Sequence, residues 1–277
     1  MRAKQQEIIA TLGVKPNIQP VQEIEKRSQF LANYLGETGL NGFVLGISGG
    51  QDSLLAGIIT QRAVDICNKN NREAYFHTML LPYGIQHDRA DAELSIEIIK
   101  SNSSDRKNII EHDLNIKTSV DAMVKEFANE YQPIGDFNKG NIKARMRMIG
   151  QYAIAGEYGL LVVGADHAAE SVTGFFTKFG DGAADIMPLS GLTKRQGRAM
   201  LEFLNIPESL LNKTPTADLL DNNPIQPDET ELGISYTEID DYLEGKTISP
   251  KVAKIIENFY EKTQHKRNLP IQYRDNK

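Results

Sequence analysis

Short apolar runs alternate along this chain with segments in which apolar residues recur every three or four positions. Apolar runs of this kind are typical of buried strands, and the wider spacing is typical of amphipathic helices. The runs predict strands at residues 43–47, 74–81, 108–112 and 160–165. The spaced segments predict helices at residues 18–38, 54–70, 88–101, 115–131, 136–158, 236–244 and 250–265.

Strands that alternate with helices favour an α/β fold, here a doubly wound parallel sheet with helices on both faces. We expect a single domain over residues 1–277. Ligands of such sheets bind beyond the carboxyl ends of the strands. The loops at 48–53 and 166–170 follow the first and fourth strands, so they should border one site. The Pro- and Asp-rich stretch 215–229 is expected to be a long loop, and loops of that length often act as lids.

The loop after the first strand has the composition of an anion site. Ser48, Gly49 and Gly50 allow the backbone to approach a ligand, and the N–H groups of the following helix point at it. A Walker A loop would supply a lysine to the phosphates, whereas this chain has Asp52. An aspartate beside phosphate requires a cation between them, and Mg²⁺ is commonly held in this way. The loop therefore predicts a pyrophosphate site, and the alternative is a glycine-rich turn without a ligand.

The loop after the fourth strand carries two acidic residues four positions apart. Asp166 and Glu170 would share a face if a helix began there, and Glu170 could complete the Mg²⁺ site begun by Asp52. Two other interpretations are open. His167 and Glu170 could form half of a zinc site, although no further His or Cys lies at ligand spacing. Asp166 could instead cap the next helix.

Residues 173–185 combine glycines, aromatic residues, Lys178 and two aspartates, and they show neither a helical nor a strand period. A loop of this kind beside a nucleotide site suits a second substrate. Its Phe rings could stack on a flat ring or belong to the core, and Lys178 could pair with a phosphate.

Two basic features suggest phosphate contacts further along the chain. Thr193 should cap a helix, which places Lys194 in the first turn, where a cation opposes the helix dipole. This conflict suggests that Lys194 is held by phosphate. The cluster at residues 265–267 either binds a ligand or complements the end of the last helix.

Composition narrows the class of protein. The net charge of −6 argues against general binding of nucleic acid. No apolar run is long enough to span a bilayer, and the first residues lack a secretory apolar segment. The single cysteine, Cys67, cannot form an internal disulfide, and its neighbours place it inside a helix. We therefore expect a cytoplasmic enzyme with no nucleic-acid or membrane partner.

The sequence SGGQDS at residues 48–53 matches the SGGxDS motif of the ATP pyrophosphatases, which split ATP between its α- and β-phosphates. The similarity extends over nearly the whole chain through GNIKARMRM, GADHAAE, TGFFTKFGDG, LTKRQGR, TPTADL, PDETELG, IDDYLEG and QHKR. Together these motifs resemble the ammonia-dependent NAD synthetases. The resemblance implies an adenine-nucleotide α-hydrolase-like fold and a homodimer that binds deamido-NAD across the subunit interface. It also implies ATP-dependent amidation of deamido-NAD with ammonia through an acyl-adenylate, giving NAD, AMP and pyrophosphate.

The same resemblance assigns roles to individual residues. ATP would contact Gly46, Ile47, Ser48, Gly49, Gly50, Gln51, Asp52, Ser53, Ala165, Lys194 and Thr216. Deamido-NAD would contact Arg145, Lys178, Asp185, His265 and Lys266. Mg²⁺ would be held by Asp52 and Glu170. The family commonly has threonine where this chain has Ala165, so we expect weaker ATP binding and not a loss of activity.

The chemistry adds one further candidate. Ammonium is mostly protonated at neutral pH, so a carboxylate near the acyl carbon should deprotonate it. Asp181 is the candidate for that role beside the catalytic pair Asp52 and Lys194, and a structural turn aspartate is the alternative. Cys67 lies about 14 residues past Ser53, or about 20 Å along a helix axis. That position makes it core and not a glutamine-splitting nucleophile, so free ammonia is the expected nitrogen source.

Two rival functions are weaker. A pyrophosphatase that acts on RNA, such as a tRNA thiolation enzyme, would want a basic surface and further cysteines. A non-catalytic adenine-nucleotide sensor would have no need to retain Asp52, Glu170 and Lys194 together.

Overall fold

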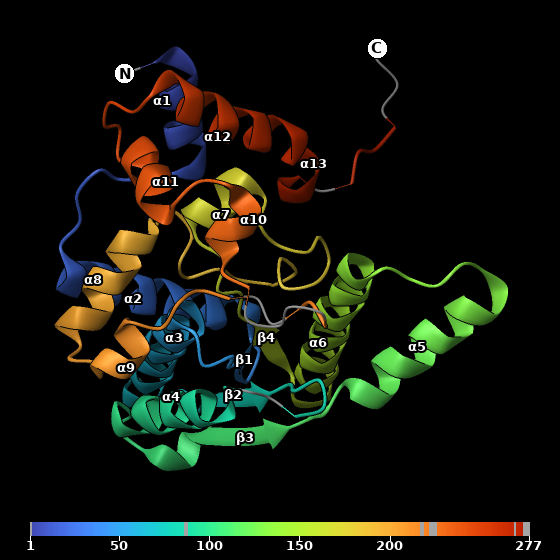
Figure 1. Ribbon diagram of the computed structural model, residues 1–277. Coiled ribbons are helices and arrows are strands. Elements are labelled where there is room, and N and C mark those ends of the chain that lie inside the picture. Colours follow the sequence, from blue (N-terminus) through green and yellow to red (C-terminus); the bar gives the residue numbers. More distant parts are fainter. Residues whose placement is uncertain (1, 86–87, 217–218, 222–225, 269, 274–277) are drawn as a thin grey trace.

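A computed structural model describes residues 2–85, 88–216, 219–221, 226–268 and 270–273 (Figure 1). Four parallel strands form one sheet in the order β3-β2-β1-β4. The strands are β1 (Gly42–Gly46), β2 (Tyr75–Leu80), β3 (Ile109–Asp113) and β4 (Leu160–Val162).

The order of the strands creates a crevice at the carboxyl end of β1. The chain moves outward from β1 to β2 and β3, then returns to place β4 on the other side of β1. Gly42 of β1 lies opposite both Tyr75 and Leu160, so β2 and β4 flank β1 in register. Loops that follow neighbouring strands diverge at such a reversal and leave room for a ligand.

Helices cover both faces of the sheet, so the doubly wound prediction is confirmed. Successive side chains of a strand point to opposite faces. Phe43 and Leu45 accordingly join one apolar cluster, and Val44 joins the other. The first cluster is closed by α2 (Pro20–Thr38), α3 (Gln51–Lys69) and α4 (Arg89–Ser101). The second is closed by α5 (Lys117–Glu130) and α6 (Asp136–Tyr158).

A third apolar cluster joins the two ends of the chain, at the top of Figure 1. Ile8, Ile239 and Tyr242 are fully buried in it. It is built by α1 (Ala3–Leu12), α7 (Ala168–Thr173), α11 (Tyr236–Leu243) and α12 (Pro250–Lys262). The sequence did not predict α1, because the helix buries only Gln5 and Ile8 and so shows little apolar period.

The remaining elements are short, namely η1 (Arg106–Asn108), α8 (Lys194–Phe203), α9 (Glu208–Leu211), α10 (Asp228–Leu232) and α13 (Gln264–Arg267). The strand expected at 160–165 ends at Val162, although Val163 still bridges to Ile186. The helix expected at 250–265 is divided at Thr263 into α12 and α13. The long loop expected at 215–229 includes the start of α10, and its residues 217–218 and 222–225 lie outside the described residues.

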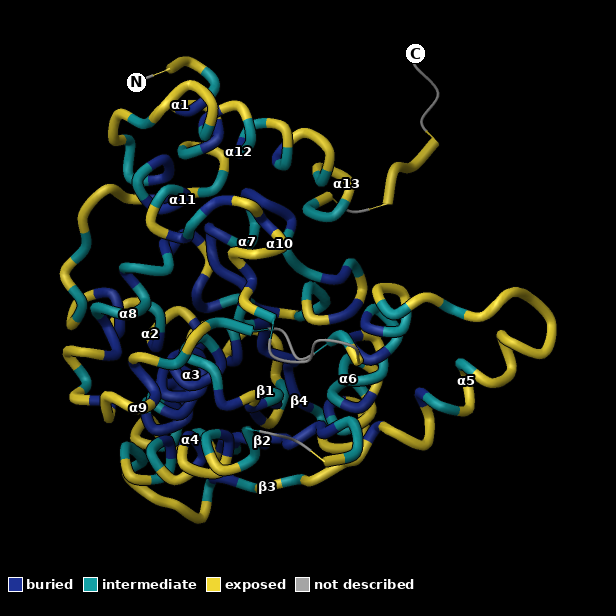
Figure 2. Tube along the Cα trace, in the orientation of Figure 1, coloured by how far each residue is buried: buried dark blue, intermediate teal, exposed yellow. Residues whose placement is uncertain are grey.

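One helix stands apart from the body of the molecule. Helix α5 extends from it as an arm (Figure 1), and most of its length is exposed (Figure 2). Val120 is the one fully buried residue among those of α5. Within the described part of the chain, no helix is both long and apolar enough to cross a bilayer.

Candidate active site

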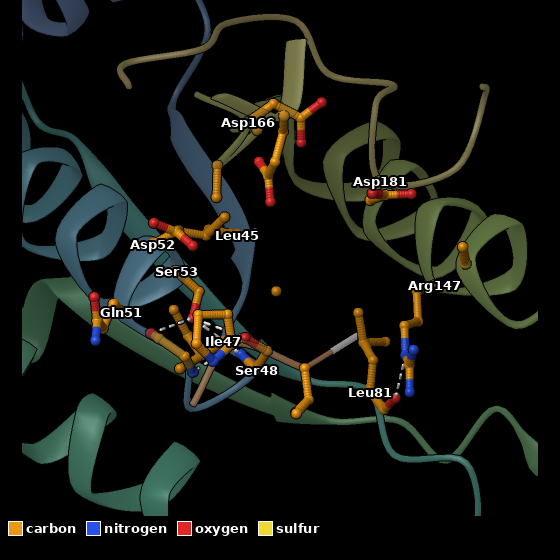
Figure 3. Close-up of a pocket in the computed structure, with 18 of the residues that line it drawn as sticks. Leu45, Ile47, Ser48, Gln51, Asp52, Ser53, Leu81, Arg147, Asp166 and Asp181 are labelled. Carbon is orange, nitrogen blue, oxygen red and sulfur yellow. Dashed lines mark hydrogen bonds between the residues drawn. The ribbon is translucent and has the colours of Figure 1, made fainter. Parts of the chain in front are cut away.

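The glycine-rich loop connects β1 to α3 and opens on a cavity of about 300 Å³. Gly49 has a φ of +81°, and a Cβ at this position would lie 2.7 Å from the backbone N of Ala92. Glycine is therefore required here, because a side chain would be strained and would meet the start of α4. The Ser53 hydroxyl lies 3.0 Å from the Ser48 hydroxyl and folds the loop over the first turn of α3 (Figure 3).

Acidic side chains surround the cavity on two sides. Figure 3 shows Asp52 and Asp166 on one side and Asp181 and Arg147 on the other. Glu170 and Lys194 also line the cavity. The loops that follow β1 and β4 thus meet at one site, which confirms the expectation that they border the same cavity.

Lys194 and Asp52 form an ion pair inside the cavity, with 2.6 Å between Nζ and Oδ2. Burial alone would raise the pKa of the Asp52 carboxyl, but the Lys194 charge, His167 and the hydrogen bonds to the carboxylate together outweigh it, and the pKa lies below its usual range. Burial would lower the pKa of Lys194, yet the Asp52 and Glu170 charges raise it above its ordinary value. At neutral pH, both groups are therefore charged.

The structure explains how a lysine is tolerated in the first turn of α8. Thr193 caps this helix as predicted, and its hydroxyl accepts the N–H of Gln196 at 3.2 Å. The buried carboxylate of Asp240 accepts the backbone N–H groups of Lys194 and Arg195 at 3.0 and 2.7 Å. An anion at this position offsets the unfavourable cation. Sequence reasoning missed Asp240, because it lies on α11, far from α8 along the chain.

The loop after β4 corrects one interpretation. Asp166 does not cap α7, because the helix begins at Ala168 and the capping side chain is His167. The His167 Nδ1 atom accepts the N–H of Glu170 at 3.4 Å, and Glu170 Oε2 accepts the N–H of His167 at 3.4 Å. Asp166 is buried beside the cavity instead. Burial and the charges of Asp181 and Asp52 raise its pKa well above the usual range.

Asp52, His167 and Glu170 form a cluster whose oxygen atoms could bind a divalent cation. Ligand atoms of Asp52, His167 and Glu170 lie within 4.8 Å of one another. Burial first, and then the neighbouring carboxylates, raise the pKa of Glu170 well above its usual range, and a bound cation would favour its charged form. Carboxylate oxygens are the ligands that Mg²⁺ prefers. Asp52 and Glu170 are thus the residues that could hold it, as the sequence suggested.

A second cavity of about 290 Å³ adjoins the first. Part of the predicted substrate loop lines it, together with residues of α6, α10 and α12. The two cavities share Phe175, Asp181, Leu219 and Asp228. A ligand in one cavity would therefore meet a ligand in the other at Asp181 and Asp228.

Asp181 has both of the properties considered for it. Its carboxylate accepts the N–H of Thr177 at 2.9 Å, as a structural turn aspartate would. Burial nevertheless raises its pKa. Asp181 is exposed and lines the walls of both cavities, where protein surrounds the solvent that its side chain meets.

The other predicted nucleotide residues lie around the first cavity. Ala165 and Thr216 line it, as do Gly46, Ile47, Ser48, Gly50, Gln51 and Ser53. The Gln51 side chain turns away to donate to the Leu211 carbonyl at 2.7 Å.

The predicted dinucleotide residues are not gathered at one point. Lys266 lines the second cavity and donates to the carbonyls of Gly174 and Phe176 at 2.8 Å. Arg145 is exposed and donates to the Lys178 carbonyl at 3.2 Å. Asp185 accepts the Val162 N–H at 2.8 Å at the end of the sheet. His265 is exposed and Lys178 is half-buried, and neither residue lines either cavity.

Two cavity residues received no role in the sequence analysis, although Arg147 lies in the GNIKARMRM motif. Arg147 donates to the Leu81 carbonyl at 3.1 Å (Figure 3). Lys213 reaches the Gly49 carbonyl at 3.1 Å and Asp88 at 2.7 Å, so it connects the glycine-rich loop to the start of α4. Basic residues just before a proline- and hydroxyl-rich turn, as in NKTPT, are the one sequence feature that could have identified Lys213.

Comparison with known proteins then decides the family. The family model described as NAD synthase matches residues 23–270. The chain belongs to the NAD synthase family. The matched residues include those that line both cavities, and the family agrees with the fold that the resemblance implied.

Individual relatives extend over nearly the whole chain. An NH(3)-dependent NAD(+) synthetase of Bacillus subtilis (strain 168) is 55% identical over 96% of each chain. A solved structure of NAD+ synthetase from Burkholderia pseudomallei is 43% identical, with a TM-score of 0.81 over 97% of each chain. A solved structure of NMN synthetase from Francisella tularensis is 32% identical, with a TM-score of 0.80 over 93% of this chain and 99% of that one.

Proposed function

We propose that this NAD synthase amidates deamido-NAD with ammonia at the expense of ATP, giving NAD, AMP and pyrophosphate. The observation that carries this proposal is the pair of adjoining cavities that meet at Asp181 and Asp228. The glycine-rich loop opens on one cavity, and part of the aromatic segment at residues 173–185 lines the other. Relatives at 53–55% identity are NH(3)-dependent NAD(+) synthetases, which agrees with this arrangement.

The first step activates a carboxylate that cannot itself react with ammonia, since its leaving group would be oxide. An oxygen of the nicotinate carboxylate attacks the α-phosphorus of ATP, and the bond to the β-phosphate oxygen breaks. The N-terminus of α3 and the Lys194 ammonium would stabilise the negative charge on the departing pyrophosphate. Asp52 and Glu170 would hold a Mg²⁺ ion, which when bound supplies further neutralisation of that charge.

In the second step ammonia attacks the acyl carbon, the bond to the AMP oxygen breaks, and the new amide nitrogen loses a proton. Ammonia must first be released from ammonium. Asp181 lines both cavities and its pKa is raised, so its carboxylate is suited to accept that proton. Asp181 is thus the proposed base.

We also propose that the enzyme works as a homodimer in the cytoplasm. The arm formed by α5 and the start of α6 exposes Met123, Phe127, Tyr131 and Phe137, each between 39% and 69% exposed. Such a cluster of large apolar side chains is typical of an interaction surface. A second copy is the partner that we propose, because Arg145 and Lys178 contribute to neither cavity of one chain. A free buried thiol at Cys67 suits the reducing cytoplasm.

Light scattering tests the dimer. Phe127→Glu should shift the protein toward a monomer, while Phe203→Glu on α8 should leave it a dimer, although Phe203 is 51% exposed. A wild-type monomer with full activity at assay concentration would contradict the proposal.

The decisive assay combines ATP, ammonium and deamido-NAD, and follows NAD and pyrophosphate. Nicotinate mononucleotide replaces deamido-NAD in a second arm, because one structural relative is an NMN synthetase. We expect turnover with the dinucleotide. Asp52→Ala and Glu170→Ala should abolish pyrophosphate release without unfolding the protein, since both residues face the cavity. Normal turnover by Asp52→Ala at the same Mg²⁺ concentration would refute the cation site.

A further inference from the structure

His167 joins β4 to α7 and is only 2% exposed. Its Nε2 atom has no hydrogen-bond partner among the described residues. A buried donor without a partner is costly, and nearly all such atoms are paired in folded proteins. The orientation of this imidazole therefore needs an explanation beyond packing.

The cap on α7 determines which ring nitrogen carries the proton. Glu170 donates its backbone N–H to Nδ1, so Nδ1 supplies the lone pair. Because a neutral imidazole has one donor and one acceptor, the proton lies on Nε2. The ring of Tyr236 stands edge-on at 6.2 Å and restricts its rotation.

The Nε2–H group lies between two carboxylates. It is 3.7 Å from Oδ1 of Asp52 and 3.7 Å from Oε2 of Glu170. Oδ2 of Asp52 is meanwhile held by Lys194. Neither distance is a hydrogen bond, but a small displacement of either carboxylate would bring it within hydrogen-bond distance of the same N–H.

We propose that His167 is a positioning residue that aligns the Asp52 and Glu170 carboxylates to hold a divalent cation. This inference rests on the cation site of the proposed function. With Nδ1 engaged in the cap and Nε2 protonated, His167 offers no lone pair to a metal. The site thus presents carboxylate oxygens, which suit Mg²⁺, and excludes the imidazole ligand that zinc would favour.

Two variants separate alignment from capping. Asparagine at position 167 keeps a good capping oxygen but is too short to place an N–H where Nε2 lies. Glutamine can reach that position with its amide N–H but is a poor cap. We therefore expect His167→Asn to unfold at nearly the wild-type temperature and His167→Gln to unfold at a lower one.

Cation affinity is measured through ATP in which methylene replaces the α,β-bridging oxygen, so that it cannot be cleaved there. Its dissociation constant is determined for the full chain with EDTA and with Mg²⁺. The value with EDTA divided by the value with Mg²⁺ measures how much the cation strengthens binding of the nucleotide. The ratio should fall about tenfold in His167→Asn, as removal of a partner of a metal ligand commonly does, and should be largely kept in His167→Gln. Asp52→Asn is the control that should abolish it.

Two results would overturn the inference. One is a ratio of dissociation constants in His167→Asn that equals the ratio in the wild-type protein. The other is electron spin-echo modulation from a directly bonded imidazole nitrogen when Mn²⁺ replaces Mg²⁺. A wild-type ratio of one would instead refute the cation site of the proposed function together with the role of His167. The two failures are thus distinguishable.

Discussion

The ammonium of Lys143 lies 2.5 Å from Oδ1 of Asp221, and this ion pair attaches the loop before α10 to α6. The Lys143 side chain is only 4% exposed and also donates to the Leu219 carbonyl at 2.8 Å. Leu219 lines both cavities. The ion pair therefore determines where one wall of the active site lies.

Asp221→Asn should lower the free energy of unfolding and raise the KM for ATP. The substitution leaves the buried Lys143 without its counter-charge. Because Asp221 is partly exposed, we expect the free energy of unfolding to fall by about 1–3 kcal/mol. Lys139→Met removes the second, less buried lysine that pairs with Asp221 and should cost about 1 kcal/mol or less. Denaturant titration checks both values, and equal costs for the two variants would contradict the argument.

Asp228→Asn should stabilise the protein more at pH 8 than at pH 5. Burial raises the pKa of Asp228 to about 6, despite the hydrogen bond from Tyr236. An acid with a raised folded pKa keeps its proton in the folded state after the unfolded chain has lost it, so its stabilising contribution falls from about pH 4 and is lost as pH rises through about 6. The neutral amide avoids that loss, which amounts to about 1–3 kcal/mol.

Unfolding temperatures measured from pH 5 to pH 8 test this. Asn at position 228 can still accept the Tyr236 hydroxyl, so the hydrogen bond is matched between the two proteins. A difference between variant and wild type that is constant over this range would show that the Asp228 charge is not its cause.

Ala165→Thr should tighten ATP binding, because it adds a hydroxyl at the edge of the first cavity. One neutral hydrogen bond contributes about 0.5–1.5 kcal/mol, which corresponds to a two- to tenfold lower KM for ATP. Ala165→Val has the same branched shape without the hydroxyl and is the control. An unchanged KM in the threonine variant would mean that the site already compensates.

Cys67→Ser should leave the ammonia-dependent rate nearly unchanged. Cys67 is buried among the residues between α2 and α3, and its thiol approaches the Ala32 carbonyl at 3.9 Å. The serine hydroxyl can donate to the same carbonyl. Robust NAD synthesis with glutamine by this chain alone, after traces of ammonia are removed, would refute the assignment of ammonia as the nitrogen source.

Local signals predicted the sheet and the phosphate loop. The apolar runs and the SGGQDS turn adopt the conformations that their own residues favour. The strand order then brings the loops after β1 and β4 together. The helix at 136–158 was predicted with the bounds of α6, because Gly159 ends it in a left-handed conformation.

Contacts between distant segments and weak local patterns explain what could not be predicted. Asp240 caps α8 from α11, and His167 caps α7 in place of Asp166 because the helix begins at Ala168, one residue later than a cap at Asp166 would require. The helix α1 has too few buried residues for a period. The dinucleotide residues remain a prediction, since Arg145 and Asp185 make backbone contacts within this chain.

The packing of the first helix against the last ones has a consequence for how the chain folds during synthesis. The Gln5 side chain donates to the Tyr242 carbonyl, 237 residues later. At roughly 5–20 residues per second, α1 emerges from the ribosome roughly 12–47 seconds before its partner exists. The sheet and its helices can form in that interval, whereas Ile8 must stay unburied. Joining the two ends is thus expected to be the final event of folding.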